Sequence, residues 1–448
     1  MTDTLETLTA ALLDAAKAAG AEAADAIAVD GTSVSIDVLN GALEHAERSE
    51  GTDIGLRVLI GQRQACVSAS DTSRETVTTM AERAVAMAQV APEDDSIGLA
   101  SPDQLAQNWD VAALDMFDPA PEPDPATLQD FAQRAEAAAL AVDGITQVES
   151  ASAGYGQRQM HLATSNDFSG GYKRSSIHTS CVAITGTGAD MERDYYGDGR
   201  IYASDMESPE HIGAMAAKRT LERAGSRQPP SGAFPVLYDE RVASSLMTHL
   251  LAAINGSAIV RGSSWLRDEM GQQILPATLS LIEDPHRPRT GSSRPFDGEG
   301  LPTARRAIID KGTLTGWTLD LATARKLGLQ STANASRGTS APPSPSTGNI
   351  TLTQGERSRD DLIRDMGTGL LVTSMIGSTI NPTTGDYSRG AAGFWVEGGE
   401  IRYPVNECTI AGNLRDMLLT LIPANDARPH LSRVVPSLLV EGLIIAGK

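Results

Sequence analysis

Histidine is the residue type in this chain that could hold a catalytic metal, and its spacing decides whether it can. The seven histidines are His45, His161, His178, His211, His249, His286 and His430. A zinc hydrolase helix carries two histidines one turn apart on one face, with a glutamate beside the first as general base. No two histidines of this sequence have that spacing. We therefore expect no catalytic and no metal-binding residue of this kind in the chain.

Nucleophilic chemistry and nucleotide binding are equally poorly supported. The sequence has no GxSxG turn, and no GxGxxG or P-loop follows a predicted strand. Ser388 has Asp386 beside it but no histidine nearby, which favours a loop hydroxyl that caps backbone groups. Cys408 lies in an apolar run, where a thiol usually fills core space.

Residues 385–393, GDYSRGAAG, combine small residues with polar and charged ones. Glycine is costly in a strand unless another backbone or a ligand approaches closely. A tight corner of a β-barrel would explain this composition, and so would an extended peptide added to a strand edge. For that second alternative, the candidate peptide-binding or subunit-interface residues are Asp386, Tyr387, Ser388, Arg389 and Gly390.

Several arginines could line a groove for a peptide carboxylate or an acidic side chain, because guanidinium groups bind carboxylates through two hydrogen bonds. They are Arg289, Arg294, Arg305, Arg306 and Arg389. A solvated face that offsets acidic neighbours is the favoured alternative.

The elements that would position these residues can be read from local patterns. Gly398-Gly399 between apolar runs predicts a two-residue hairpin, after a polar loop at 381–390. Residues 239–254 predict a helix with His249 on its apolar stripe, as a packed and hydrogen-bonded core residue. Residues 27–39 predict a hairpin that turns at Asp30-Gly31, and residues 331–348 a mobile loop near any cleft.

The order of these elements predicts an α+β protein. Its N-terminal part would be α/β, with mixed or antiparallel sheets and helices, and its C-terminal domain β-rich and barrel-like. The expected domains are an N-terminal α/β domain at 1–112, a central α/β domain at 113–227 and the β-rich domain at 231–448. The first two share strands and a closing helix, each opened by a helix, which indicates a structural pseudo-repeat.

Composition narrows the possible partners and the compartment. A net charge of −20 argues against direct nucleic-acid binding, which needs a basic face. No run is long and apolar enough to span a membrane, and the N-terminus lacks the basic start of a signal peptide. Three widely spaced cysteines, Cys66, Cys181 and Cys408, fit a reducing compartment. We therefore expect a cytoplasmic protein.

The C-terminal stretch also carries a family resemblance. The run GDYSRGAAGFWVEGGEIRYPVNECTIAGNL, together with ATARKLG at 322–328, resembles the TldD/TldE (PmbA) metallopeptidase family. The likeness covers nearly the whole chain and is weaker in the first two hundred residues. Within the family it is similar to the TldE/PmbA type, because the HExxxH helix of the TldD type falls here at residues 242–256, which hold one histidine and no acid.

The resemblance implies a function. The chain would be the metal-free subunit of a cytoplasmic TldD/TldE heterodimer that degrades unfolded or small peptides and processes peptide precursors. It would have no cofactor of its own, a TldD-type HExxxH subunit as its partner, and peptides as substrates. The chain would not be catalytic by itself. In the absence of the partner it could form a homodimer. An older family name refers to modulation of DNA gyrase; the acidic charge indicates that any such effect is indirect.

Two other classes of function remain open at this point. One is a self-sufficient homodimeric metallopeptidase with scattered ligands, such as His249, His286, Asp284 or Cys408. The other is a non-enzymatic scaffold that binds peptides without a protease partner.

Overall fold

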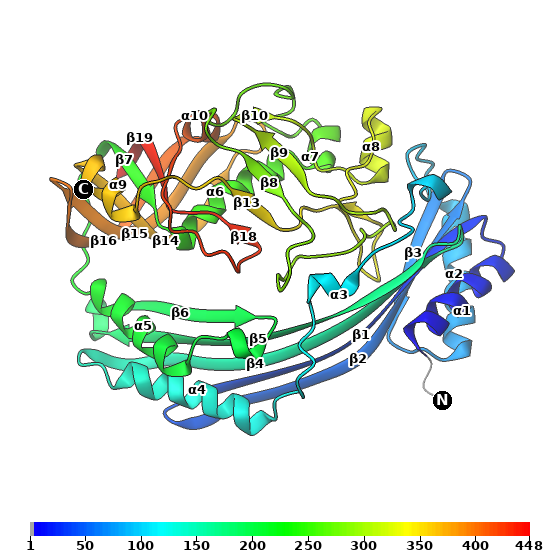
Figure 1. Ribbon diagram of the computed structural model, residues 1–448, viewed down its shortest axis with the longest axis horizontal. Helices are drawn as coiled ribbons and strands as arrows, with labels where there is room; N and C mark the ends of the chain where they lie inside the picture. Colours follow the sequence, from blue (N-terminus) through cyan, green and yellow to red (C-terminus); the bar gives the residue numbers. More distant parts are fainter. Residues whose placement is uncertain (1–3) are drawn as a thin grey trace.

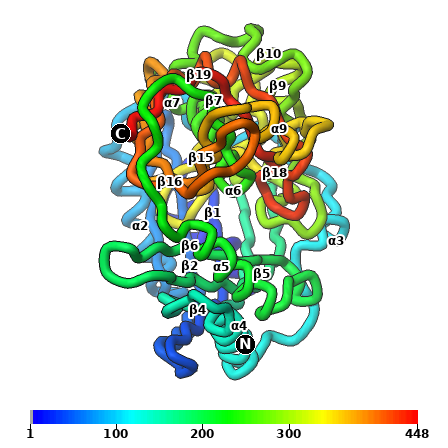
Figure 2. The backbone as a smooth tube through the Cα atoms, turned by 90° about the vertical axis from the view of Figure 1, so that its left-hand side faces the viewer, coloured from blue at the N-terminus to red at the C-terminus, as the bar shows by residue number. Residues whose placement is uncertain are grey.

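The computed structural model describes residues 4–448. Figure 1 shows a long curved sheet built from the N-terminal half of the chain, with the C-terminal half lying over its concave face. Figure 2, turned by 90°, shows the same two layers stacked on each other. The fold is mixed α+β, which confirms the predicted class. No helix within residues 4–448 is long and apolar enough to cross a membrane.

The N-terminal sheet has six strands: β1 (Ala23–Leu39), β2 (Ala42–Ile60), β3 (Arg63–Ala69), β4 (Ile145–Thr164), β5 (Ser169–Thr185) and β6 (Glu192–Arg200). Their order is β3-β2-β1-β4-β5-β6, and all neighbours are antiparallel. Strands from the first two predicted domains thus share one sheet through the β1–β4 pairing. The division at 112/113 stays a prediction.

Residues 27–39 belong to one continuous strand, so the predicted hairpin is wrong. Asp30 and Gly31 lie inside β1, opposite Thr52 and Gly51 of β2. An Asp-Gly pair makes a turn when the segments on its two sides pair with each other. Here both segments pair with β2 on one edge and with β4 on the other, and this continuous pairing overrides the local turn signal.

Helices cover the convex face of the sheet (Figure 1). They are α1 (Leu5–Ala18), α2 (Arg74–Val90), α4 (Pro125–Leu140) and α5 (Pro209–Glu222). Asp124 and Ser208 cap α4 and α5, as predicted, by accepting backbone N–H groups of the first turn. Each half of the sheet therefore has the order helix, three strands, helix, which agrees with the expected pseudo-repeat.

The connector between the two halves of the sheet, residues 91–124, is mostly irregular and holds the short helix α3 (Val111–Leu114). Trp109 packs against Phe168 of the sheet side, at 5.7 Å between ring centroids, and against Phe296 of the C-terminal half, at 5.1 Å. The connector thus joins both layers in one apolar cluster.

The C-terminal half contains a five-stranded barrel. Its strands are β7 (Gly232–Tyr238), β14 (Gly369–Ile380), β15 (Asp386–Glu397), β16 (Glu400–Asn413) and β19 (Leu438–Ala446). They run in the order β16-β15-β14-β7-β19, and a β16–β19 pairing closes the barrel. The two-residue strand β17 (Ile422–Pro423) pairs with β19.

A second sheet and five helices complete this half. The sheet has the order β10 (Thr313–Leu314), β9 (Arg306–Asp310), β8 (Leu281–Glu283), β13 (Ile350–Leu352) and β18 (Arg433–Val434). The helices are α6 (Glu240–Ala253), α7 (Gly256–Val260), α8 (Leu321–Leu327), α9 (Arg359–Met366) and α10 (Leu414–Leu419), and a two-residue pair, β11 (Ala335–Ser336) and β12 (Ser344–Pro345), stands apart. The buried face of α6 packs into the core shared by the barrel and this sheet.

The hairpin at Gly398-Gly399 is confirmed, and both glycines have positive φ, 62° and 77°. The predicted loop at 381–390 is shorter than expected, because β15 already begins at Asp386. The polar residues DYSRG read as a loop, but their backbone pairs with β16 on one side and with β14 on the other. Pairing with two strands again outweighs local residue preference.

A buried ion-pair group fastens the two layers together. Asp25 of β1 binds Arg57 of β2, with 2.6 Å between Oδ2 and Nε, and its other oxygen binds Arg337 of the C-terminal half. At Gly55 the loop 331–348 lies so close that a Cβ atom would be 2.2 Å from the carbonyl oxygen of Thr339. This loop, predicted to lie near a cleft, therefore packs against the sheet.

Candidate functional site

Helix α6 lies on the side of the C-terminal half that faces the curved sheet (Figure 1). It begins after Asp239, whose carboxylate accepts the backbone N–H of Arg241 at 3.2 Å. Its apolar stripe is buried, whereas Ser244, Ser245 and Thr248 on the other face are half-buried. The hydroxyls of Ser245 and Thr248 donate back to carbonyls of the same helix. This face thus offers hydroxyls where a metal helix carries imidazole and carboxylate.

The residues of α6 do not fit a zinc ion. Zinc sites use cysteine, histidine and carboxylate ligands, and of these α6 has only His249 and, in its first turn, Glu240, which is bound by Arg428. Within residues 4–448, no three histidine, cysteine or acidic side chains are grouped so that they could hold a metal. His286 instead shares a hydrogen bond of 3.0 Å with Thr303, and Cys408 donates to the carbonyl of Ala391. The scattered ligand set considered for a self-sufficient enzyme is not assembled in the described chain.

His249 packs against Tyr387 of the barrel, with ring centroids 6.0 Å apart and the rings edge to face. The expectation of a packed histidine agrees with this position. The expected hydrogen bond is absent at Nε2, which is buried without a partner among the described residues. Burial lowers the pKa of His249, and the charge of Arg389 lowers it further. The ring is therefore held neutral.

The five candidate residues at 386–390 do not form one site, because successive side chains of a strand point to opposite faces. Tyr387 is buried, and its hydroxyl is 3.4 Å from that of Tyr238. Burial raises the pKa of Tyr387, and the charge of Arg389 opposes this shift. Asp386 is exposed and accepts hydrogen bonds from Thr384 and Asn413, which lower its pKa.

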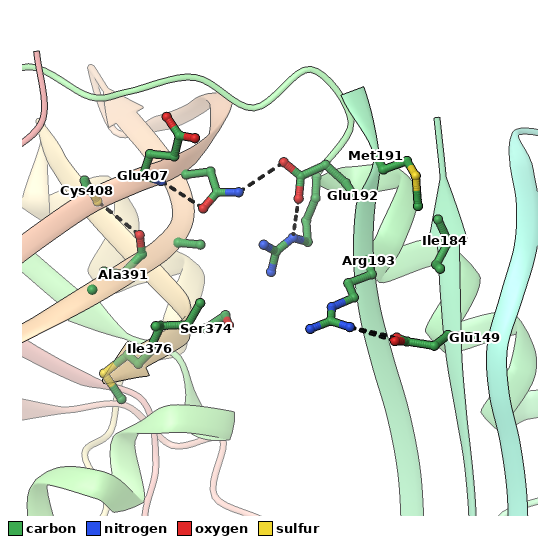
Figure 3. A pocket seen from close by; sticks show the side chains of 15 residues that line it. Glu149, Ile184, Met191, Glu192, Arg193, Ser374, Ile376, Ala391, Glu407 and Cys408 are labelled. Atoms are coloured by element: carbon green, nitrogen blue, oxygen red, sulfur yellow. Dashed lines mark hydrogen bonds and ion pairs between the residues drawn. The ribbon is translucent and has the colours of Figure 1, made fainter. Parts of the chain in front are cut away.

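Gly390 is the member of this group that lines a cavity of about 580 Å³ between the barrel and the N-terminal sheet (Figure 3). Strands β14, β15 and β16 supply one wall, and β4, β5 and β6 supply the other together with Met191 and with Arg223, the C-cap of α5. The lining residues are Glu149, Ile184, Met191, Glu192, Arg193, Arg223, Ser374, Met375, Ile376, Gly390, Ala391, Ala392, Asn406, Glu407 and Cys408.

The part of the barrel wall that β15 supplies consists of small residues. Gly390 and two alanines follow each other there, and at the neighbouring Gly393 a Cβ atom would lie 1.9 Å from the carbonyl oxygen of Leu371. The close approach of β14 and β15 thus explains the glycines that the sequence pattern singles out. Ile376, 77% exposed, and Met191, 44% exposed, add apolar surface at the cavity.

Charged groups on the opposite wall are already paired. Glu192 accepts hydrogen bonds from Asn406 and Arg223, both at 3.3 Å, and Arg193 binds Glu149 at 2.8 Å, as Figure 3 shows. Burial raises the pKa of the Cys408 thiol to about 11, so it stays protonated near neutral pH. The cavity therefore suits an apolar, extended segment rather than a nucleophilic reaction.

The arginines expected to share one groove are separated in the structure. Arg289 pairs with Asp115 and Asp205, and Arg306 pairs with Glu283. Arg294 alone lines a second cavity, where it meets arginines from β4 and β5 that sequence reasoning missed. Arg158 and Arg174 are distant from Arg294 in sequence. The β4–β5 pairing places Arg158 opposite Arg174, and both line the same cavity as Arg294.

Comparison with known proteins places this geometry in a family. Sequence models of the PmbA/TldA metallopeptidase match domain 1 at residues 24–88, the central domain at 118–224 and the C-terminal domain at 231–447. The chain is 38% identical over 444 residues to the metalloprotease PmbA of Escherichia coli O157:H7, covering 98% of this chain and 95% of that one. It is 36% identical over 441 residues to a PmbA homologue of Haemophilus influenzae, covering 97% and 94%.

Solved structures agree at the level of the fold. A candidate modulator of DNA gyrase from Bacteroides thetaiotaomicron superposes with a TM-score of 0.92 at 26% identity, covering 99% of this chain and 100% of that one. TldE from Thermococcus kodakarensis superposes with a TM-score of 0.86 at 20% identity, covering 98% and 100%. The likeness to TldE is one of fold alone. From the family models and the PmbA relatives together, this chain belongs to the PmbA/TldD metallopeptidase family.

Proposed function

We propose that this chain is the metal-free subunit of a two-subunit metallopeptidase, whose metal helix is supplied by a partner of the HExxxH-bearing type. The observation that carries the proposal is the composition of α6. By the family resemblance, this helix stands where the partner type carries its metal helix, and its half-buried face presents Ser244, Ser245 and Thr248. Hydroxyls bonded to their own helix do not replace two imidazoles and a general base.

The substrates of the pair would be unfolded or small peptides and peptide precursors. The small residues of the barrel wall at Gly390 and Ala391 support this, since an extended chain packs closely on small residues. Asp386 and Ser388 continue the same strand toward an exposed end and would contribute to the partner interface or to peptide contact, whereas Tyr387 between them is buried.

The proposed compartment is the cytoplasm, and an effect on DNA gyrase would be indirect. Cys66, Cys181 and Cys408 are free thiols, which supports a reducing environment. The net charge of −20 opposes binding to a phosphate backbone.

Reconstitution tests the proposal. The purified chain, the HExxxH-bearing partner and their mixture are assayed for cleavage of an unstructured peptide. We expect cleavage in the mixture and none by this chain alone, because the general base and metal ligands come from the partner. A matched mixture, in which the partner's motif glutamate is replaced by glutamine, should lose activity. Cleavage by the isolated chain at the rate of the mixture would refute the subunit role.

A further inference from the structure

A second cavity, of about 340 Å³, lies between the concave face of the N-terminal sheet and loops of the C-terminal half. Strands β1, β4 and β5 form one wall, and segments 292–298, 335–337 and 346–348 form the other. Its volume is at the lower end of small-ligand pockets, so it suits the end of a chain better than a folded partner. It is separate from the cavity at Gly390, with which it shares no lining residue.

The cavity gathers positive charge in an acidic protein. Four of its lining residues are arginines: Arg158, Arg174, Arg294 and Arg337. Arg337 pairs with Asp25, which also binds Arg57. The other three form no ion pair with any carboxylate in the described part of the chain, although most arginines elsewhere do. Burial lowers the pKa of Arg174, and the charges of Arg158 and Arg294 lower it further, so the three guanidinium groups repel one another.

Two of these arginines are held in place by backbone carbonyls. Arg174 donates to the carbonyls of Gly291 and Ser293, the latter at 2.6 Å. Arg294 donates to the carbonyls of Ala335 and Ser346, at 3.4 and 3.0 Å. Because a guanidinium has five N–H groups, each side chain is fixed and still has donors left over. Neutral carbonyls orient these arginines without cancelling their charge.

The wall beside the arginines is apolar. Ile27, Met160, Tyr172 and Phe296 line it, and the rings of Tyr172 and Phe296 meet edge to face at 5.6 Å. The one carboxyl group among the lining residues, Asp297, is buried and accepts three backbone N–H groups. A ligand that contacts both the arginines and the apolar residues would carry two anionic oxygen atoms close to an apolar group.

We propose that this cavity binds the C-terminal carboxylate of a peptide, with Arg158, Arg174 and Arg294 around the carboxylate and the last side chain against the apolar wall. A carboxylate accepts the paired N–H groups of guanidinium, and an α-carboxylate stands one carbon from its side chain. An inorganic anion would use the arginines and leave the apolar wall uncovered. The proposal deepens the peptidase role and rests on it only for the source of the peptide.

Calorimetric titration of the isolated full-length chain tests this directly. The probes are N-acetyl-Ala-Ala-Leu as the free acid, the same tripeptide as its C-terminal amide, and inorganic phosphate. We expect the acid to bind, and the amide to bind at least about tenfold more weakly, since it loses a charge-assisted interaction. Phosphate should bind more weakly than the acid. Equal affinity for acid and amide, no binding of the acid, or tighter binding of phosphate would each overturn the proposal.

Arg158→Gln is the informative variant, because Arg158 is exposed and holds no structural hydrogen bond among the described residues. It should weaken binding of the acid about tenfold and leave the thermal midpoint unchanged. Arg261→Gln, at an exposed arginine outside the cavity, is the matched control and should bind like the parent chain. Equal loss in both variants would contradict a local site. The titration uses this chain without a partner subunit. A chain that binds no peptide acid could therefore still support cleavage in the reconstituted mixture, and a mixture without cleavage would not prevent the binding measurement.

Discussion

At the scale of single residues, α6 shows which features of a site can be sought in the sequence. A metal motif is local, since its ligands lie one turn apart on one helix, and residues 242–256 lack it. The lowered pKa of His249 could not be predicted from the sequence around it. It depends on Tyr387 and Arg389, which lie more than a hundred residues away and approach only when β15 packs over α6.

The buried carboxyl of Glu299 gives a pH prediction. Burial and the neighbouring charge of Asp297 raise the pKa of Glu299 to about 8, against 4.5 when exposed. Below pH 4.5 the group is neutral in both states, and its contribution to folding is fully present. As pH rises from about 4.5 to 8, the unfolded chain ionises first, so the free energy of unfolding falls.

Replacing Glu299 by glutamine should remove this dependence, because the amide stays neutral and its oxygen can still accept the backbone N–H of Leu321. The difference in thermal midpoint between Glu299→Gln and the parent chain should therefore grow in favour of the variant from pH 5 to pH 8. Glu356→Gln, at an exposed glutamate, is the control. A difference that stays constant over this range would show that Glu299 does not titrate with a raised pKa.

At the scale of elements, sequence patterns succeed where one neighbour decides the structure. The Gly398-Gly399 hairpin and the caps at Asp124 and Ser208 are local and are present as predicted. Patterns fail where a strand has two neighbours. Asp30-Gly31 reads as a turn, and residues 386–390 read as a loop, but pairing on both edges keeps each segment extended.

The exposed end of β14 belongs to the same scale and gives a test of the partner interface. Ile376 is 77% exposed and lines the first cavity. Covering an aliphatic side chain with a partner removes apolar surface from water and so favours association. Ile376→Asp should weaken association with the HExxxH-bearing partner by about tenfold or more, at an unchanged thermal midpoint. Equilibrium binding to the immobilised partner measures this.

Leu43→Asp serves as the matched control, because Leu43 is 48% exposed on β2 and lies outside both cavities. It should leave the affinity for the partner unchanged. If Ile376→Asp bound the partner as tightly as the parent chain, the end of β14 would not be part of the interface.

At the scale of the whole molecule, the two layers depend on contacts that no sequence window contains. Asp25 and Arg57 face each other across β1 and β2, and Arg337 reaches the same carboxylate from the C-terminal half. The class of fold could be predicted from the order of helices and strands. The cavities between the layers could not, because their walls come from segments far apart in sequence, such as those of Ile27 and Gly348 in the second cavity.

Asp25→Asn should destabilise the chain strongly. Asp25 is 2% exposed and Arg57 is 4% exposed, so the variant leaves the buried guanidinium groups of Arg57 and Arg337 without their ion-pair partner. We expect a loss of about 3–5 kcal/mol in the free energy of unfolding, measured by denaturant titration. Asp30→Asn, at an exposed position of the same strand, should change it by less than about 0.5 kcal/mol. A near-neutral Asp25→Asn would show that these ion pairs do not hold the layers together.

The metal content of this chain, alone and in complex with an HExxxH-bearing subunit, tests the central claim most directly. Both samples are incubated with zinc, passed through a desalting column and analysed by atomic emission. Since the described part of the chain groups no three histidine, cysteine or acidic side chains that could hold a metal, we predict no stoichiometric metal in the isolated chain and one metal ion per complex. That metal should be lost when the partner's motif histidines are replaced by alanine. Stoichiometric metal retained by the isolated chain would contradict the assignment of this chain as the metal-free subunit.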